Sequence, residues 1–307
     1  MFENSVPRDE LNRNGACVKN LAMIAGDLHL EMTVRMVEKI LAAAVLSDPI
    51  DHLVIDEFLP SALAEQLSSE FVSYDDPNWH AYKNSIEDKK TCNQWNLFPP
   101  QTYQYFCAVC SDVVSKAIAS KFGIEAEADI GLHGGGQHIH ARMGNLNPHL
   151  DYSIHPKSGK ERRINAIYYL TDQHTEDDGG HFGLWDNQSE DEPGDLRWEY
   201  APTFNRLILF NTSQNSWHGL SRRYEPIEGR FRKSLASYYV SEPRHEALTH
   251  TRALFAPRVD QREDEGVREL IKQRADEKTV AQAFWAGARM APSADGSPRD
   301  GTKRYFP

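Results

Sequence analysis

The chain has 307 residues, of which 40% are hydrophobic and 26% are charged, a composition typical of a globular protein with a substantial core. Its formal net charge of −11 argues against nucleic acid as a general partner. The longest apolar stretch, residues 40–46, is far shorter than the roughly 20 residues of a membrane-spanning helix, and the polar N-terminal residues do not resemble a signal peptide. We therefore expect a cytoplasmic protein that has no membrane partner.

The residue composition of the sequence changes twice along its length. Residues 1–126 are expected to be mostly helical and to pack on a core formed by residues 127–243, with residues 244–307 as a C-terminal extension. Helical spacing of apolar residues and a proline before the second helix give the boundaries in the first part. In chain order we expect a helix over 27–47, an extended segment over 52–59, a helix over 61–71, a long ordered loop over 74–100 and one amphipathic helix over 101–121.

The central part carries the signals of an antiparallel sheet. Short runs of Val, Ile, Leu, Phe and Tyr alternate with clusters of Gly, Pro, Asn and Asp, and their irregular spacing favours a jelly roll over a parallel sheet. The fold class expected is therefore mainly β with flanking helices (α+β). Strands are predicted over 137–143, 165–170, 181–184, 206–210 and 234–240, a further helix over 264–274, and disorder over the last 17 or so residues, from 291.

One motif in this part suggests a metal site. His149 and Asp151 are two residues apart, so in an extended strand their side chains point to the same face. A third ligand, His218, would complete a set of two histidines and one carboxylate, which leaves open positions on iron(II). A His-x-Asp pair alone is a weak signal, because two polar residues in a loop produce the same pattern. The order of the strands and turns around it makes the signal stronger.

Residues 137–241 resemble the double-stranded β-helix of the prolyl-hydroxylase-like branch of the iron(II)- and 2-oxoglutarate-dependent oxygenases. The segment NPHLDYSIHP is similar to the iron-binding strand and turn of that family, and INAIYYLT to its next core strand. DDGGHFGLW resembles its Gly-Gly hairpin, and PTFNRLILFNTSQNSWHGL resembles the strand that leads to the distal histidine. The last piece, GRFRKSLASYYV, resembles the strand with a basic residue for the co-substrate. The matching pieces occur in the family's order.

The resemblance implies a role for six residues. His149, Asp151 and His218 would bind iron, and Arg232 would pair with the distal carboxylate of 2-oxoglutarate. Ser234 and Tyr169 would help to hold that co-substrate. Two of these choices have rivals, since Arg230 shares the strand parity of Arg232 and Tyr168 is adjacent to Tyr169.

Other residues have a less certain place in the predicted site. His138 and His140 share one strand face and can approach the metal pocket, although core or solvated positions are the alternative. Arg162 stands where related enzymes place a basic residue near the substrate entrance, or is a surface arginine. Substrate capture is expected from the aromatic-rich residues 79–98 and from residues 249–257, unless these aromatics only pin the helices onto the sheet.

The implied activity is that of a dioxygenase that hydroxylates an unactivated C–H bond with release of succinate and CO2. It would require Fe2+, 2-oxoglutarate and O2, with ascorbate as a stimulant. The alternatives are a non-catalytic binding or sensor module on the same fold and another metal-dependent enzyme. Halogenation is disfavoured, because related halogenases lack the carboxylate that Asp151 supplies. The substrate, a small molecule or a peptidyl residue, is left open.

Overall fold

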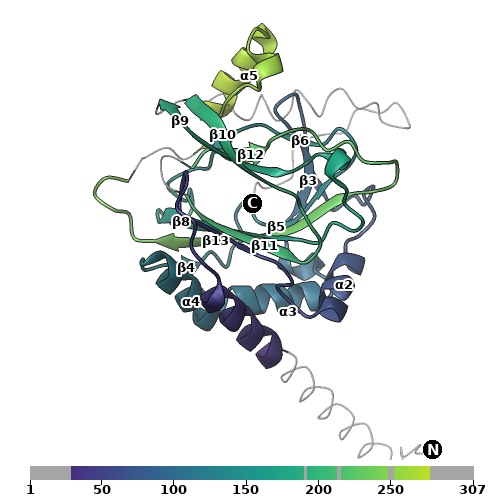
Figure 1. The fold of residues 1–307 in the computed structure, drawn as a ribbon, viewed down its shortest axis with the longest axis vertical. Coiled ribbons are helices and arrows are strands. Elements are labelled where there is room, and N and C mark those ends of the chain that lie inside the picture. The colour runs from purple at the N-terminus through teal and green to yellow at the C-terminus, as the bar shows by residue number, and fades with distance from the viewer. Residues whose placement is uncertain (1–28, 190–191, 213–215, 248–251, 277–307) are drawn as a thin grey trace, which may run out of the picture.

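The computed structural model describes residues 29–189, 192–212, 216–247 and 252–276 of the chain. Two antiparallel sheets enclose a common interior (Figure 1). The strand order of the larger sheet is β1 (His52–Ile55), β11 (Arg206–Asn211), β8 (Glu161–Tyr169), β13 (Arg232–Ser241), β5 (Gly136–His140), β3 (Glu87–Cys92) and β2 (His80–Lys83), with β4 (Glu127–Ala128) beside β13 and β6 (Asn145–Leu146) beside β3. The order of the smaller sheet is β10 (Glu192–Tyr200), β9 (Phe182–Ser189), β12 (His218–Leu220), β7 (His149–Leu150) and β14 (Leu254–Phe255).

This pair of curled antiparallel sheets is the predicted jelly-roll core. Each of the five predicted strands is present within a few residues of its expected bounds. The strand β10 was not predicted, because its sequence, EPGDLRWEY, has a proline, a glycine and charged residues and leaves most of its side chains exposed. It extends β9 into a hairpin at the edge of the smaller sheet.

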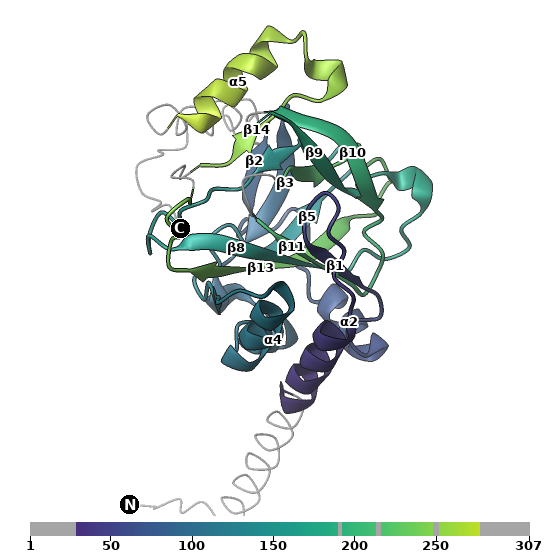
Figure 2. The same ribbon diagram turned by 60° about the vertical axis from the view of Figure 1, so that its left-hand side comes forward.

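Helices cover the outer face of the larger sheet (Figures 1 and 2). They are a helix over residues 29–42, α2 (Ser61–Ser69), α3 (Pro100–Val109) and α4 (Asp112–Phe122). The alternation of side chains along β8 separates this helical side from the interior. Tyr168 is fully buried and stacks on Tyr105 of α3 at 5.5 Å, whereas Tyr169 faces the interior between the sheets. The predicted packing of N-terminal helices on a β core is therefore present.

The single helix predicted over 101–121 is wrong, because two helices occupy this stretch. The first ends at Val109, and the second begins after Ser111, whose side chain accepts a hydrogen bond from the backbone N–H of Val114. This cap satisfies a backbone donor that the first turn of a helix leaves without a partner. The second helix ends at Phe122, and Gly123 caps it with a φ of 62°.

The long loop predicted over 74–100 is also wrong. Residues in its middle form the hairpin β2–β3, and β3 pairs with β5 so that the hairpin becomes part of the larger sheet. The turn is held by Asn84, whose side-chain oxygen accepts hydrogen bonds from the backbone of Ile86 and Glu87 at 3.0 and 2.9 Å. The sequence of β3, EDKKTC, has no apolar alternation, because the side chains on its inner face, Glu87, Lys89 and Thr91, line the cavity. The usual strand signal is therefore missing.

The C-terminal segment returns to the smaller sheet. The helix predicted over 264–274 is present as α5 (Glu265–Ala275), with Asp264 as its N-cap. It lies with β14 at the end of the molecule opposite the other helices (Figure 2). The tail from residue 291, predicted to be disordered, lies outside the described residues. In the described ranges, every helix is too short or too polar to cross a bilayer.

Candidate active site

The predicted metal ligands come together on the smaller sheet. His149 of β7 and His218 of β12 are direct cross-strand partners, and Asp151 follows β7 by one residue. Asp151 lies between the two rings, with Oδ1 3.8 Å from His149 Nε2 and Oδ2 3.3 Å from His218 Nε2. One ligand atom from each residue lies within 4.8 Å of the others. This spacing is compatible with three ligands on one ion.

Backbone contacts orient both imidazoles toward this point. Nδ1 of His149 lies 2.9 Å from the carbonyl oxygen of Asn147, and Nδ1 of His218 lies 2.7 Å from that of Ser216. A ring whose Nδ1–H donates to a carbonyl carries its lone pair on Nε2, which is the tautomer that binds a metal through Nε2. Both rings therefore present Nε2, in the tautomer that binds a metal, on the side of Asp151.

The protonation states also suit a divalent cation. Burial and the nearby His218 lower the pKa of His149 to about 3, so its ring is neutral. Burial acts to raise the pKa of Asp151, but the charge of Arg162 and the contact with His218 outweigh it and hold that pKa well below its ordinary value. A buried carboxylate beside a neutral imidazole is a donor set for iron or a similar transition metal.

A cavity of about 200 Å³ opens beside these ligands, between the two sheets. Four cationic side chains, Lys89, Arg162, Arg232 and Arg274, line it together with two carboxylates. They come from β3, β8, β13 and α5. Cations therefore outnumber carboxylates among the charged side chains on its walls.

The predicted co-substrate residues lie on one wall of this cavity. Arg232 is 4% exposed, its Nε donates to the carbonyl oxygen of Gly180 at 2.7 Å, and its Nη2 lies 3.3 Å from the hydroxyl of Tyr169. Ser234 faces the same cavity and pairs with Tyr169 across the strands. Among the described residues, no carboxylate lies at ion-pair distance from Arg232, and burial lowers its pKa. A buried guanidinium without an acidic partner favours binding of an external anion.

The side chains of Tyr168 and Arg230, the alternatives to Tyr169 and Arg232, do not face the cavity. The hydroxyl of Tyr168 donates to the side chain of Asn205 on the helical side of the sheet, at 2.7 Å. Arg230 lies before β13 and pairs with Asp178 at 2.7 Å, outside the cavity. The side chains that face the cavity are therefore those of Tyr169 and Arg232, as the parity of their strands predicts.

The predicted Gly-Gly hairpin leaves space for the side chain of Arg232. Gly180 has a φ of 68°, a conformation that side chains rarely adopt. A Cβ atom there would lie 2.9 Å from the ring of Tyr224 and 3.2 Å from Cδ of Arg232. A larger residue would therefore displace the guanidinium.

Asp151 has further partners from β8. Arg162 is 2% exposed, and its Nη1 lies 3.5 Å from Oδ1 of Asp151, so the surface position considered for this arginine is wrong. Nδ2 of Asn165 donates to Oδ2 of Asp151 at 2.6 Å. The only sequence signal for Asn165 is its parity, because 165, 167 and 169 alternate with the residues that face the helices. Asn165 was therefore not among the residues that the sequence predicted for the site.

The remaining candidates divide between the cavity and the core. His138 and His140 line the cavity, and Nε2 of His138 lies 3.1 Å from the carbonyl oxygen of Gly134.

Of the aromatic residues in 79–98, Tyr82 lines the cavity, while Trp79, Trp95 and Phe98 pack with the helical core. From residues 249–257, Ala253 and Phe255 line the cavity, and 249–251 lie outside the described residues. The ring of Phe255 stacks on His149 with centroids 5.1 Å apart.

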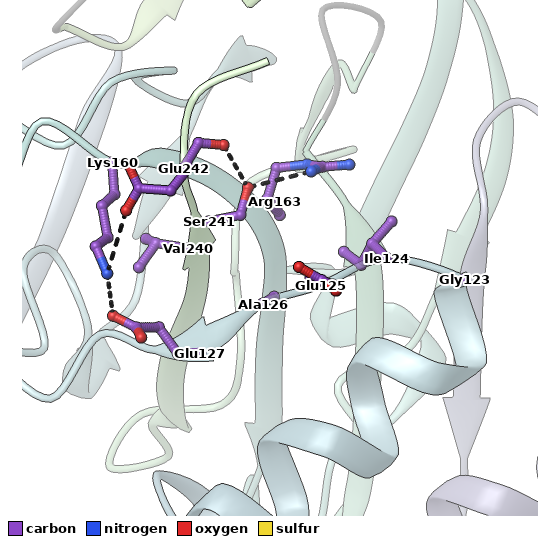
Figure 3. A pocket seen from close by; sticks show the side chains of 10 residues that line it. All are labelled: Gly123, Ile124, Glu125, Ala126, Glu127, Lys160, Arg163, Val240, Ser241 and Glu242. Atoms are coloured by element: carbon purple, nitrogen blue, oxygen red, sulfur yellow. Dashed lines mark hydrogen bonds and ion pairs between the residues drawn. The ribbon is translucent and has the colours of Figure 1, made fainter.

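A wider hollow of about 590 Å³ lies at the end of α4, away from the metal ligands (Figure 3). Its charged groups compensate one another, since Lys160 pairs with Glu127 at 2.5 Å and with Glu242 at 3.8 Å. Arg163 donates to the hydroxyl of Ser241 at its edge. In the described part of the chain, only His149, Asp151 and His218 form a cluster suited to a metal, so this hollow is not the candidate site.

A double-stranded β-helix that carries two histidines and a carboxylate beside a cationic cavity defines a class of metal-dependent oxygenases. Residues 136–240, which include all three ligands, match the family model of the 2OG-Fe(II) oxygenase superfamily. The part of the chain that carries the three ligands is therefore similar to this superfamily.

Several solved structures are similar to part of this chain, among them three that are each less than 20% identical to it. A prolyl-4-hydroxylase from Pseudomonas putida is 18% identical with a TM-score of 0.46, over 69% of this chain and 100% of that chain. A prolyl hydroxylase from Trichoplax adhaerens, in complex with a hypoxia inducible factor peptide fragment, is 14% identical with a TM-score of 0.44, over 70% and 91%. HygX from Streptomyces hygroscopicus, with nickel, 2-oxoglutarate and hygromycin B bound, is 16% identical with a TM-score of 0.42, over 62% and 82%. No curated protein matches the chain.

Proposed function

We propose that the chain is an iron(II)- and 2-oxoglutarate-dependent hydroxylase. The observation that carries this proposal is Arg232, a buried cation without an acidic partner among the described residues, in the same cavity as the three metal ligands. A site that only binds a metal has no need for such a group. A co-substrate that chelates the metal at one end and has a free carboxylate at the other needs both features.

Each residue has a separate task in the proposed reaction. Iron(II), when held by His149, Asp151 and His218, would supply the reaction of O2 with 2-oxoglutarate that yields succinate and CO2 and converts a substrate C–H into C–OH. Arg232 binds the distal carboxylate of 2-oxoglutarate through its guanidinium, and Tyr169 donates a hydrogen bond beside it. The enclosed cavity excludes bulk water and holds the substrate C–H near the metal.

An untargeted screen for succinate tests this function. The protein is incubated with Fe2+, 2-oxoglutarate, O2 and ascorbate, and succinate is measured as classes of small molecules and peptides are added. We expect succinate that depends on Fe2+ and O2 and increases with a suitable substrate. His218→Ala is the matched control, because it removes one ligand from the centre. If wild-type protein binds metal and 2-oxoglutarate but forms no succinate in any condition, the chain is a binding or sensor module.

A further inference from the structure

The C-terminal segment, residues 252–276, contributes a strand to the sheet that carries the metal ligands. β14 pairs with β7, and Phe255 is the direct cross-strand partner of the ligand His149. Their rings stack with centroids 5.1 Å apart. The segment follows residues 136–240, which match the superfamily. Its contacts with the metal centre therefore come from a part of the chain outside that match.

Gln261 links this segment to the backbone that orients His149. It is 5% exposed, and its side-chain oxygen accepts a hydrogen bond from Nδ2 of Asn147 at 2.6 Å. Its side-chain nitrogen donates to the carbonyl oxygen of Ser85 at 2.9 Å. Asn147 is fully buried, and its own carbonyl oxygen lies 2.9 Å from Nδ1 of His149. Gln261 therefore holds the residue whose carbonyl fixes the orientation and tautomer of a metal ligand.

Arg258 joins the strands of the two histidine ligands. Its Nε and Nη2 donate to the side-chain oxygen of Asn145 at 3.0 and 2.6 Å, and Nη2 also lies 3.3 Å from the carbonyl oxygen of Leu146. Its Nη1 donates to the carbonyl oxygen of Ser221, directly after β12, at 2.9 Å. The planar guanidinium therefore fixes the spacing between the chain that enters β7 and the chain that leaves β12.

The two ligand strands are in close contact at this point. Gly219 follows the ligand His218, and a Cβ atom at Gly219 would lie 2.6 Å from the carbonyl oxygen of Asn147 and 2.9 Å from that of Leu146. Such close packing prevents the two strands from shifting independently. A change in the position of Asn147 therefore changes the positions of both His149 and His218.

A separate contact anchors the other end of the segment. Nη2 of Arg274 in α5 lies 2.8 Å from Oε2 of the buried Glu87 in β3, and Nζ of Lys89 lies 3.1 Å from Oε1. Burial raises the pKa of Glu87, but the charges of Arg274 and Lys89 outweigh burial and lower it to about 2. Glu87 therefore stays ionised. Its ion pair fixes α5 to the larger sheet, while β14 is part of the smaller one.

We propose that Arg258 and Gln261 are positioning residues of the metal centre, which make the C-terminal segment a part of that centre. This inference rests on the proposed function, because it requires that the three ligands bind a metal. Both residues lie outside the cavity lining and outside the cluster of ligating side chains, so they act through the backbone that they hold. Loss of either side chain should loosen the ligands and weaken metal binding.

Metal affinity separates positioning from a purely electrostatic effect. Arg258→Met removes a positive charge near a cation site, and that loss alone would strengthen metal binding. If Arg258 positions the ligands, the variant should instead bind metal about 10- to 100-fold more weakly. Gln261→Leu removes no charge and should weaken binding by a similar factor. Full-length apoprotein is titrated with Co2+ in competition with a chelator, and the visible absorption of bound Co2+ reports the geometry of its ligands.

Two matched controls lie in the same segment. Arg262→Met removes the same charge from an exposed position, and Gln273→Leu makes the same change in α5, where Gln273 donates to Glu269 at 3.0 Å. Both should retain the wild-type affinity for Co2+ and the wild-type absorption spectrum. Melting curves set the temperature of the titrations, so that every variant is folded when its affinity is measured.

Hydrogen exchange of the wild-type protein tests the same inference without any substitution. If the segment tightens the metal site, the bound metal must stabilise the segment by the same factor. Binding of Co2+ should therefore slow amide exchange in residues 254–261 about tenfold or more. Exchange in α4, on the outer face of the larger sheet, should be unchanged. This measurement supports or refutes the inference even if both substitutions prevent folding.

Two results would overturn the inference while leaving the proposed function intact. In the first, Arg258→Met and Gln261→Leu both bind Co2+ as tightly as wild type, with an unchanged spectrum. In the second, metal binding leaves exchange in residues 254–261 unchanged. By contrast, a wild-type protein that binds no metal at His149, Asp151 and His218 would refute the proposed function together with this inference.

Discussion

Substitution of Arg232 by methionine should separate ligand binding from folding. The guanidinium is buried, and its hydrogen-bond partners among the described residues, the carbonyl of Gly180 and the hydroxyl of Tyr169, are both neutral. A buried charge without a counter-ion costs folding free energy, and apolar replacement of such groups is often neutral or stabilising. In Arg232→Met, the free energy of unfolding of the ligand-free protein should therefore be unchanged or higher by about 1 kcal/mol.

The same substitution should strongly weaken binding of 2-oxoglutarate. Loss of a charge-assisted contact in a buried site costs on the order of 2–4 kcal/mol, which corresponds to roughly 30- to several-hundred-fold in affinity. Calorimetric titration of metal-loaded protein measures this affinity, and urea denaturation measures the free energy of unfolding. Metal content should stay close to that of wild type, because Arg232 is not a ligand.

Lys233→Met is the control for this experiment. Lys233 is the next residue of β13, and its Nζ contacts Asp172 and Ser68 rather than the cavity. Its removal should leave the affinity for 2-oxoglutarate within about twofold. The reasoning is refuted if Arg232→Met binds 2-oxoglutarate like wild type. A strong loss in Arg230→Met, with none in Arg232→Met, would refute it as well.

Three further predictions concern the metal centre and the charged cavity wall. His149→Ala and His218→Ala should each abolish binding of the single iron without loss of fold, as checked by anaerobic titration with metal analysis and by circular dichroism; full binding in both variants would rule out these ligands. Asn165→Ala should weaken metal binding by about 10- to 100-fold, because Asn165 holds the ligand Asp151, and competition with a chelator measures the change. The folded-state pKa of Glu87 is about 2 against an ordinary 4.5, so its contribution to stability is complete above pH 4.5 and is lost as the pH falls toward 2. Urea denaturation should therefore give a smaller loss of stability between pH 6 and pH 3 in Glu87→Gln than in wild type, and equal losses would contradict this.

Short-range periodicity was sufficient to predict the inner face of the core strands. In β8 and β13, residues two apart face the cavity, so Tyr169, Arg232 and Ser234 lie on the side that the sequence predicted. The triad was predictable for the same reason, since His149 and Asp151 share a face and the distal histidine follows a recognisable strand.

Features that depend on distant contacts were not predictable in this way. The charged residues of β3 form a strand because Glu87 is buried by Lys89 and by Arg274 of α5, nearly 190 residues later in the chain. Arg162 was considered as a surface residue because nothing near it in the sequence shows the rings of Tyr152 and Tyr238 that enclose it. The break between α3 and α4 depends on a single cap, Ser111, inside a continuous apolar pattern.

The central claim is that one cavity binds both a metal at His149, Asp151 and His218 and 2-oxoglutarate at Arg232. Calorimetric titration of 2-oxoglutarate, with and without the oxygen-stable ion Mn2+, tests it most directly. We predict one 2-oxoglutarate per chain and an affinity about tenfold or more higher with the metal, because the metal and the arginine would bind opposite ends of one molecule. The same affinity with and without metal, or with metal in wild type and in Asp151→Ala, would contradict the account.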